Sequence, residues 1–199
     1  IADRAQKDRL YQSTLSRWRL SSNRIRSLYQ YESGLALLEK NGNDAETLAE
    51  VKGKLQLAYR FYSINIDILI RMYRLEDPND PDWKSTVVKQ ITQNQEKLSQ
   101  DISRYESRKK LIPPDQYKEG LGELYNQYAW LVANTEGDYE RALQYSLSSL
   151  EFLGSEDIDQ RAARLDTCAR CYFALGRVEE AVQTQKQAIT LDPFSPPML

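Results

Sequence analysis

The chain has 199 residues, with 27 Lys and Arg, 29 Asp and Glu, two Cys and no His. This length suffices for one or two domains with a real core, and the lack of His excludes Ser-His-Asp triads, Cys-His pairs and imidazole metal ligands. Seven Pro and eight Gly are few for an all-β protein, which needs many turns. The composition therefore argues against an all-β fold, and the spacing of apolar residues described below predicts an all-α one.

Charge is distributed unevenly along the chain. Residues 1–110 carry 20 basic and 15 acidic side chains, whereas residues 111–199 carry 7 basic and 14 acidic ones. This split suggests two modules with different surfaces. Much of the basic excess lies at the start of the chain, in Arg4, Lys7, Arg9, Arg17, Arg19, Arg24 and Arg26. An ordinary solvated helix face is the favoured explanation, and no nucleic-acid partner is expected.

No segment has the roughly 18 consecutive apolar residues that a membrane-spanning helix needs. The chain begins at Ile1, so we expect that it was processed or trimmed from a longer protein. Proximity to a membrane is expected only if an anchor was removed upstream of Ile1, and localisation is left open.

The first 112 residues read as long helices separated by polar, Pro- and Gly-containing breaks at 40–44, 77–81 and 112–115. Between the breaks, apolar residues recur at steps of three and four, which is typical of helices. The expected buried stripes are Tyr11, Leu15, Trp18, Ser22, Ile25 and Tyr29 in the first segment; Leu48, Val51, Leu55, Ala58, Tyr62, Ile66, Leu69 and Tyr73 in the second; and Val87, Ile91, Asn94, Leu98, Ile102 and Tyr105 in the third. We therefore predict an N-terminal bundle of long antiparallel helices over residues 1–112.

Shorter helices are expected over residues 113–199. The predicted elements are Leu124–Ala133, Tyr139–Leu153, Gln160–Leu175 and Val178–Leu191. Two similar segments, each with the pattern Gly-x-x-Glu-x-Ala, begin at Gly137 and Gly176, which are 39 residues apart. A period in the range of 20 to 50 residues indicates helical repeats.

The region from residue 116 to residue 193 resembles tetratricopeptide repeats, most clearly in its second unit. The residues that carry the resemblance are Leu165, Cys168, Ala169, Tyr172, Gly176, Ala181, Ala188 and Pro193, while Gln185 stands where the family prefers a bulky apolar residue. The resemblance implies two helical hairpins with a concave surface that binds a protein or peptide. By position, it assigns partner binding to the first helix of each hairpin, at Asn126, Trp130, Asn134, Asp166, Arg170 and Phe173, beside Glu123 and Gln127.

Three further expectations come with this assignment. Trp130 should be partly exposed, because the adjacent Ala129 faces the other helix of its hairpin. Asp166 stands where a clamp for a C-terminal carboxylate would need Lys or Asn, so such a ligand is not expected. Because two repeats are fewer than stability usually needs, the N-terminal bundle should pack on Tyr117–Tyr128.

The cysteines and carboxylates show no pattern typical of a metal site or an active site. Cys168 and Cys171 lie within a predicted helix without further soft ligands, so we expect packing residues and no disulfide or metal. Asp77, Asp80 and Asp82 lack the Gly and the terminal Glu of a calcium loop, and capping explains them better. No catalytic residue, cofactor or metal is expected.

The sequence thus predicts a non-catalytic protein–protein interaction module or scaffold. An alternative is a structural element that forms a homodimer through the long N-terminal helices. Phe61, Tyr59, Tyr62 and Tyr73 crowd the second segment with more aromatic surface than one stripe can bury. Some of that surface should therefore meet another chain or another module.

Overall fold

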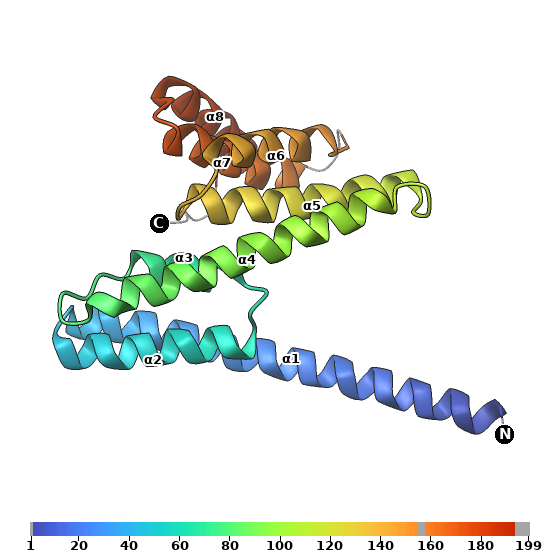
Figure 1. Ribbon diagram of the computed structural model, residues 1–199, viewed down its shortest axis with the longest axis horizontal. Coiled ribbons are helices and arrows are strands. Elements are labelled where there is room, and N and C mark those ends of the chain that lie inside the picture. Colours follow the sequence, from blue (N-terminus) through green and yellow to red (C-terminus); the bar gives the residue numbers. More distant parts are fainter. Residues whose placement is uncertain (1, 155–157, 194–199) are drawn as a thin grey trace. The chain divides into compact units, whose positions relative to one another are not determined.

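The computed structural model describes residues 2–154 and 158–193, with the side chains of Arg19 and of residues from Ser21 onward. Within these ranges there are eight helices and no strand, which confirms the all-α prediction. The helices are α1 (Ala2–Asn41), α2 (Ala45–Phe61), α3 (Ile66–Arg74), α4 (Pro81–Ser107), α5 (Pro114–Ala133), α6 (Tyr139–Glu151), α7 (Ile158–Ala174) and α8 (Val178–Leu191) (Figure 1). None of these described helices is both long and apolar enough to cross a membrane.

The chain divides into two compact units, residues 1–87 and residues 88–199. The first unit holds α1, α2, α3 and the first turns of α4. The second unit holds the rest of α4 and α5 to α8. The predicted domain boundary between residues 112 and 113 stays a prediction.

Helices α1 and α2 of the first unit approach closely through small residues. The Ser27 hydroxyl donates a hydrogen bond to the Ala58 carbonyl oxygen at 2.8 Å. Gly34 is buried, and a Cβ atom at this position would lie 3.5 Å from the Cβ atom of Lys54. Buried Leu48, Val51, Leu55 and Ala58 supply the facing stripe of α2, as predicted.

The predicted buried stripe of α1 is wrong where it can be tested. Ile25 is 69% exposed and Tyr29 is 67% exposed, whereas Ser27, between them, is buried. The side chains of Tyr11, Leu15 and Trp18 lie outside the described residues. The physical reason is steric, because Ser27 and Gly34 let α1 lie closer to α2 than large apolar side chains could.

The N-terminal part of α1 runs past the end of α2 (Figure 1). Ser27 lies opposite Ala58, one turn before α2 ends at Phe61, so the preceding residues of α1 extend beyond that end. Leu28 is 57% exposed next to Tyr29, and Arg24 and Arg26 beside them are exposed as well. This stretch of α1 therefore presents apolar and basic side chains together.

The second predicted long helix is broken in two, so the expectation of one long helix between the breaks at 40–44 and 77–81 is wrong. Tyr62 ends α2 with a non-helical backbone, at φ −146° and ψ 74°. Asn65 then begins α3, where its side-chain oxygen accepts a hydrogen bond from the amide of Asp67 at 3.1 Å. An Asn cap followed by an acidic residue in the first turn favours a new helix start over continuation.

Helix α4 buries the predicted stripe. Val87, Ile91, Leu98 and Ile102 are buried, and Asn94 and Tyr105 are half-buried. Towards its C-terminal end, in the second unit, the Tyr105 ring stacks on that of Tyr117 with 5.8 Å between centroids. The Tyr125 hydroxyl donates a hydrogen bond to a Glu106 carboxylate oxygen at 2.7 Å. Part of the segment 1–112 thus packs on the region of Tyr117–Tyr128, as expected.

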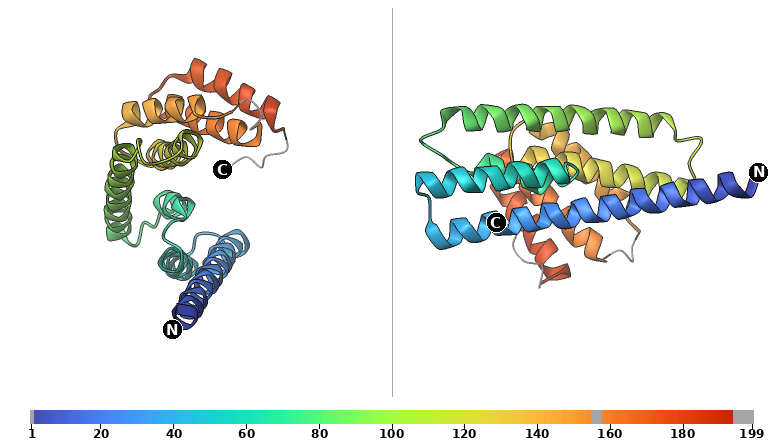
Figure 2. Two further views of the ribbon diagram at one scale, coloured as in Figure 1. Left: turned by 90° about the vertical axis from the view of Figure 1, so that its right-hand side faces the viewer. Right: turned by 90° about the horizontal axis from the view of Figure 1, so that it is seen from below.

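In the second unit, α7 contacts α5, α6 and α8, while α5 also contacts α6 (Figure 2). Five consecutive residues of α5, from Tyr128 to Val132, are buried. Since successive residues point about 100° apart on a helix, this part of α5 is covered on every side. It forms the centre of the second unit.

Candidate partner-binding groove

The turn between α7 and α8 is set by Gly176. Its φ of +74° lies in the left-handed region that other residues rarely adopt. The Gly176 amide donates to the Phe173 carbonyl at 2.9 Å, and the Arg177 amide donates to the Tyr172 carbonyl at 2.9 Å, the bonding pattern of a Schellman motif. Buried Ala169 and Ala181 are small, as close packing between α7 and α8 requires.

A groove of about 290 Å³ opens on the face of α7 and α8. Its lining is mainly apolar, with Phe173 62% exposed and Val182 48% exposed. The Gln185 side-chain amide donates a hydrogen bond to the Asp166 carboxylate at 2.8 Å. This bond joins α8 to α7 at one side of the groove. The lining residues are Asp166, Ala169, Arg170, Phe173, Ala181, Val182 and Gln185.

The six residues assigned to partner binding are therefore separated. Asp166, Arg170 and Phe173 line this groove together, and its lining includes none of Asn126, Trp130 and Asn134. That these six residues bind a partner stays a prediction.

The expectation that Trp130 is partly exposed is wrong, because only 8% of its surface is accessible. It belongs to the stretch of α5 that is covered on every side. Asn134 is buried at the end of α5, where its side-chain amide donates to the Trp130 carbonyl at 2.9 Å. The side-chain oxygen of Asn126 is buried without a hydrogen-bond partner among the described residues.

A second hollow, of about 450 Å³, lies between the start of α5, the end of α6 and α7. Arg164 reaches it from α7 although only 3% of its surface is exposed, and its guanidinium donates to the Ser149 carbonyl at 2.5 Å. Gly122 makes room for it, since a Cβ atom there would lie 2.7 Å from the guanidinium. The rim is mixed in charge, with Lys118 beside Asp115, Glu119 and Glu151.

The two cysteines are free and buried, as the packing prediction requires. Burial raises the pKa of the Cys171 thiol to about 12, and a contact with Ser146 offsets part of this rise. Burial likewise raises the pKa of Cys168. Since the thiolate is the reactive form, both side chains act as small packing groups between α7 and its neighbours. No group of three or more Cys, Asp or Glu side chains among the described residues could hold a metal ion.

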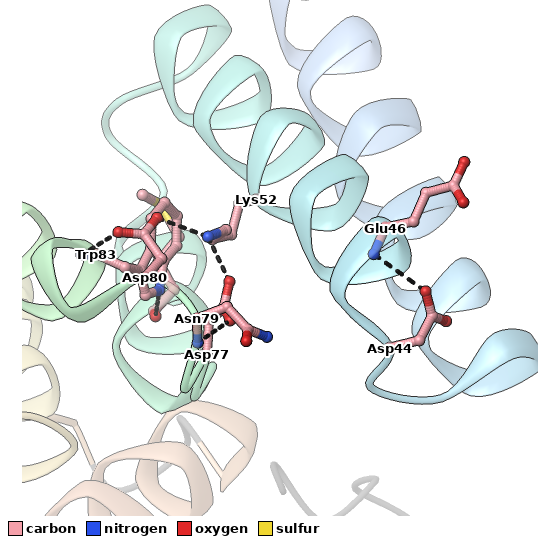
Figure 3. Close-up of polar contacts among 8 residues, drawn as sticks. Asp44, Glu46, Lys52, Asp77, Asn79, Asp80 and Trp83 are labelled. Atoms are coloured by element: carbon pink, nitrogen blue, oxygen red, sulfur yellow. Dashed lines mark hydrogen bonds and ion pairs between the residues drawn. The ribbon is translucent and has the colours of Figure 1, made fainter.

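The acidic turn between α3 and α4 binds a lysine of the first unit (Figure 3). Lys52 donates to Asp77 at 2.5 Å and to Asp80 at 2.7 Å. Asp80 also accepts from the Trp83 amide at the start of α4, at 3.1 Å, so part of the capping prediction holds. The hydrogen bond from Lys52 is the main cause that holds the pKa of Asp77 below its ordinary value. These side chains join α2 to the turn before α4.

A known family matches the C-terminal part of α7 and the whole of α8. Residues 168–195 match the model of the tetratricopeptide repeat, so the resemblance predicted for this part of the chain is confirmed there. No curated protein matches the chain.

Sequence reasoning missed the share of α8 in the groove. The family pattern assigns binding to the first helix of each pair, so no residue of α8 was selected, whereas Ala181, Val182 and Gln185 of α8 line the groove. A signal was present, because Val178, Val182, Gln185 and Ile189 recur at helical spacing on α8.

Proposed function

We propose that this chain is a non-catalytic interaction module that binds a protein partner through the groove of α7 and α8. Tetratricopeptide repeats generally bind protein partners, and the matched segment includes most of this groove. The observation that carries the proposal is the exposure of Phe173, with 62% of its surface accessible beside a hollow of about 290 Å³. An aromatic side chain next to Arg170 at an open groove has the composition of an interface hot spot.

The test compares capture of proteins from source-cell lysate by the full chain and by two single variants. Phe173→Asp places a charge in the groove, and because the side chain is exposed the variant should fold normally. Leu147→Asp is the matched control, since Leu147 is 40% exposed on α6 and does not line the groove. We expect at least one protein to be captured by the parent chain and by the Leu147 variant but lost with Phe173→Asp. Equal capture by all three chains would refute the proposal.

A second candidate function is dimerisation through the long helices of the first unit. It is supported by Ile25, Leu28 and Tyr29, which are all more than half exposed on the part of α1 near and beyond the end of α2. Buried against a second copy, these side chains would leave water at a gain of about 25 cal/mol per Å² of apolar surface. Mass measured over a hundredfold range of concentration tests it. A dimer that Ile25→Asp abolishes supports this function, and a monomer throughout contradicts it.

A further inference from the structure

The two helical pairs of the second unit can be compared position by position. The pair α5/α6 and the pair α7/α8 each turn at a Gly with positive φ, Gly137 and Gly176, and these lie 39 residues apart. The same offset relates Leu143 to Val182, Ser146 to Gln185 and Ser149 to Ala188. One pair therefore shows what the equivalent surface of the other can accommodate.

On the first pair, this surface is covered by α7. The Cys171 thiol donates to the Ala129 carbonyl at 3.9 Å, and the Arg164 guanidinium donates to the Ser149 carbonyl at 2.5 Å. Ser146 and Ser149 are wholly buried, and Leu143 is 4% exposed. A helix thus lies on this face, held by small side chains along its length and by one basic residue at the C-terminal turn of α6.

On the second pair, the equivalent surface is open at Val182, whereas Ala188, the counterpart of Ser149, is buried and Gln185 is half-buried. Val182 is 48% exposed where its counterpart Leu143 is buried, and Val178 and Ile189 are 47% and 54% exposed. With Gln185 these residues form a single stripe along α8, at steps of four, three and four. The groove of about 290 Å³ lies beside this stripe. An apolar helical stripe of this length with a hollow beside it is suited to a second helix.

We infer that the open face of α7 and α8 binds an amphipathic helix of a partner protein in the manner in which α7 lies on α5 and α6. This inference rests on the proposed interaction function and specifies the partner. The contact face of the partner helix carries small side chains at the spacing of Thr167, Cys168 and Cys171 in α7, because larger side chains would hold the partner helix away from α8. A basic residue one turn before them, as Arg164 is in α7, would meet the carbonyl groups at the C-terminal turn of α8, which favour positive charge.

The chain itself supplies the probe. A fluorescent peptide with the sequence of residues 158–174 is stapled between positions 159 and 163, because Asp159 and Ala163 are exposed on α7 and an unstapled peptide of this length is a marginal helix in water. Anisotropy is measured as the full chain is added under reducing conditions. The protein variants are Val182→Glu in the open face and Leu147→Glu, on α6, as control. A second peptide carries Cys168→Leu and Cys171→Leu.

We expect the stapled peptide to bind the parent chain and the Leu147 variant alike. Val182→Glu should weaken binding by roughly tenfold or more, because a carboxylate would be buried against the helix. The leucine peptide should lose affinity to a similar extent. Absence of binding by the parent chain, or equal affinity for the Val182 variant, overturns the inference, and the latter would mean that the peptide replaces α7 on its own site.

The two proposals can fail separately. If Phe173→Asp abolishes capture of a lysate protein while the stapled peptide does not bind, the interaction function stands and the assignment of a helix with small side chains falls. If the peptide binds with the expected dependence on Val182 but no lysate protein depends on Phe173, the helix-binding face stands and the capture-based function falls.

Discussion

The contacts that stabilise the first unit differ in kind from those that stabilise the second unit. In the second unit, α5 is covered on every side and its neighbours meet through small residues such as Ala169, Ala181 and Cys171. In the first unit, the buried residues of the described part of α1, Ser27 and Gly34, lie on one side of the helix, and the turn before α4 is bonded to α2 by Lys52. Packing in the second unit thus depends on shape, while the first unit adds a polar contact that pH can alter.

The largest effect is expected where the second unit is most enclosed. Trp130→Ala should lower the free energy of unfolding by about 3–5 kcal/mol, because the substitution removes a buried aromatic side chain and leaves a cavity. Phe173→Ala, at an exposed aromatic residue, should cost less than about 1 kcal/mol. Denaturant unfolding followed by circular dichroism measures both. Similar losses for the two variants would contradict the assignment of α5 as the centre of the unit.

A smaller loss is expected from overpacking α7 against α8. Ala181 is 6% exposed, so Ala181→Leu should destabilise by roughly 1–3 kcal/mol, the usual cost of extra methylene groups in a packed site. The control is Ala163→Leu at an exposed position of α7, which should change stability by about 0.5 kcal/mol or less. An unchanged melting temperature for the Ala181 variant would remove the support for close packing at this position.

Two glycines allow the units to be compared directly. Gly42 after α1 has a φ of +78°, Gly176 after α7 has a φ of +74°, and neither would place an added Cβ atom within 4 Å of another group. Gly42→Ala and Gly176→Ala should therefore each cost about 1–2 kcal/mol through backbone strain alone. Equal losses support this view. A much larger loss at Gly176 would show that the second unit depends on its turn in a way that the first does not.

The comparison also explains which parts of the fold can be read from the sequence. The stripe of α4 and the turn at Gly176 were predictable, because large apolar residues at helical spacing and a Gly at a helix end each have one dominant cause. The buried face of α1 could not be predicted, since Ser27 and Gly34 are not large apolar residues, whereas the neighbouring Ile25 and Tyr29 are. The break before Asn65 was missed because an apolar stripe continues across it.

The candidate site was predicted in part. Asp166, Arg170 and Phe173 do line one groove, because successive turns of a single helix bring them together. Trp130 was misplaced, since periodicity shows which side of a helix is apolar but not how many sides are covered. The run Tyr128-Ala129-Trp130-Leu131-Val132 is apolar all round, and that is the signal of a buried helix.

The smallest effect is expected from the polar contact of the first unit. Lys52→Met removes the donor to Asp77 and Asp80, and it should reduce stability at neutral pH by less than either glycine substitution, because Asp77 keeps the hydrogen bond from the Asn79 amide at 2.9 Å and the Asp80 side chain, 41% exposed, stays in contact with water. Lys54→Met is the matched control on the same helix, since the Lys54 ammonium pairs with the exposed Glu50, at 3.4 Å, and Met keeps the aliphatic part of the side chain beside Gly34. Unfolding of the parent chain and of both variants is compared over a range of pH.

The pH dependence separates this contact from simple packing. The pKa of Asp77 is lowered in the folded state from its ordinary value of 3.8, chiefly by the hydrogen bond from Lys52, so its contribution is present above that value and is lost as pH falls through the lowered pKa. Burial lowers the pKa of Lys52, but its hydrogen bonds to Asp77 and Asp80 outweigh this and raise it above 10.5, so its contribution is lost as pH rises through the raised value. The difference between the parent chain and Lys52→Met should therefore be greatest between about pH 4 and pH 10 and shrink on both sides. A difference that does not change with pH would show that Lys52 acts through the packing of its aliphatic chain, and not through its charge on the two carboxylates or on the Trp83 ring, whose centroid lies 5.5 Å from the Lys52 ammonium.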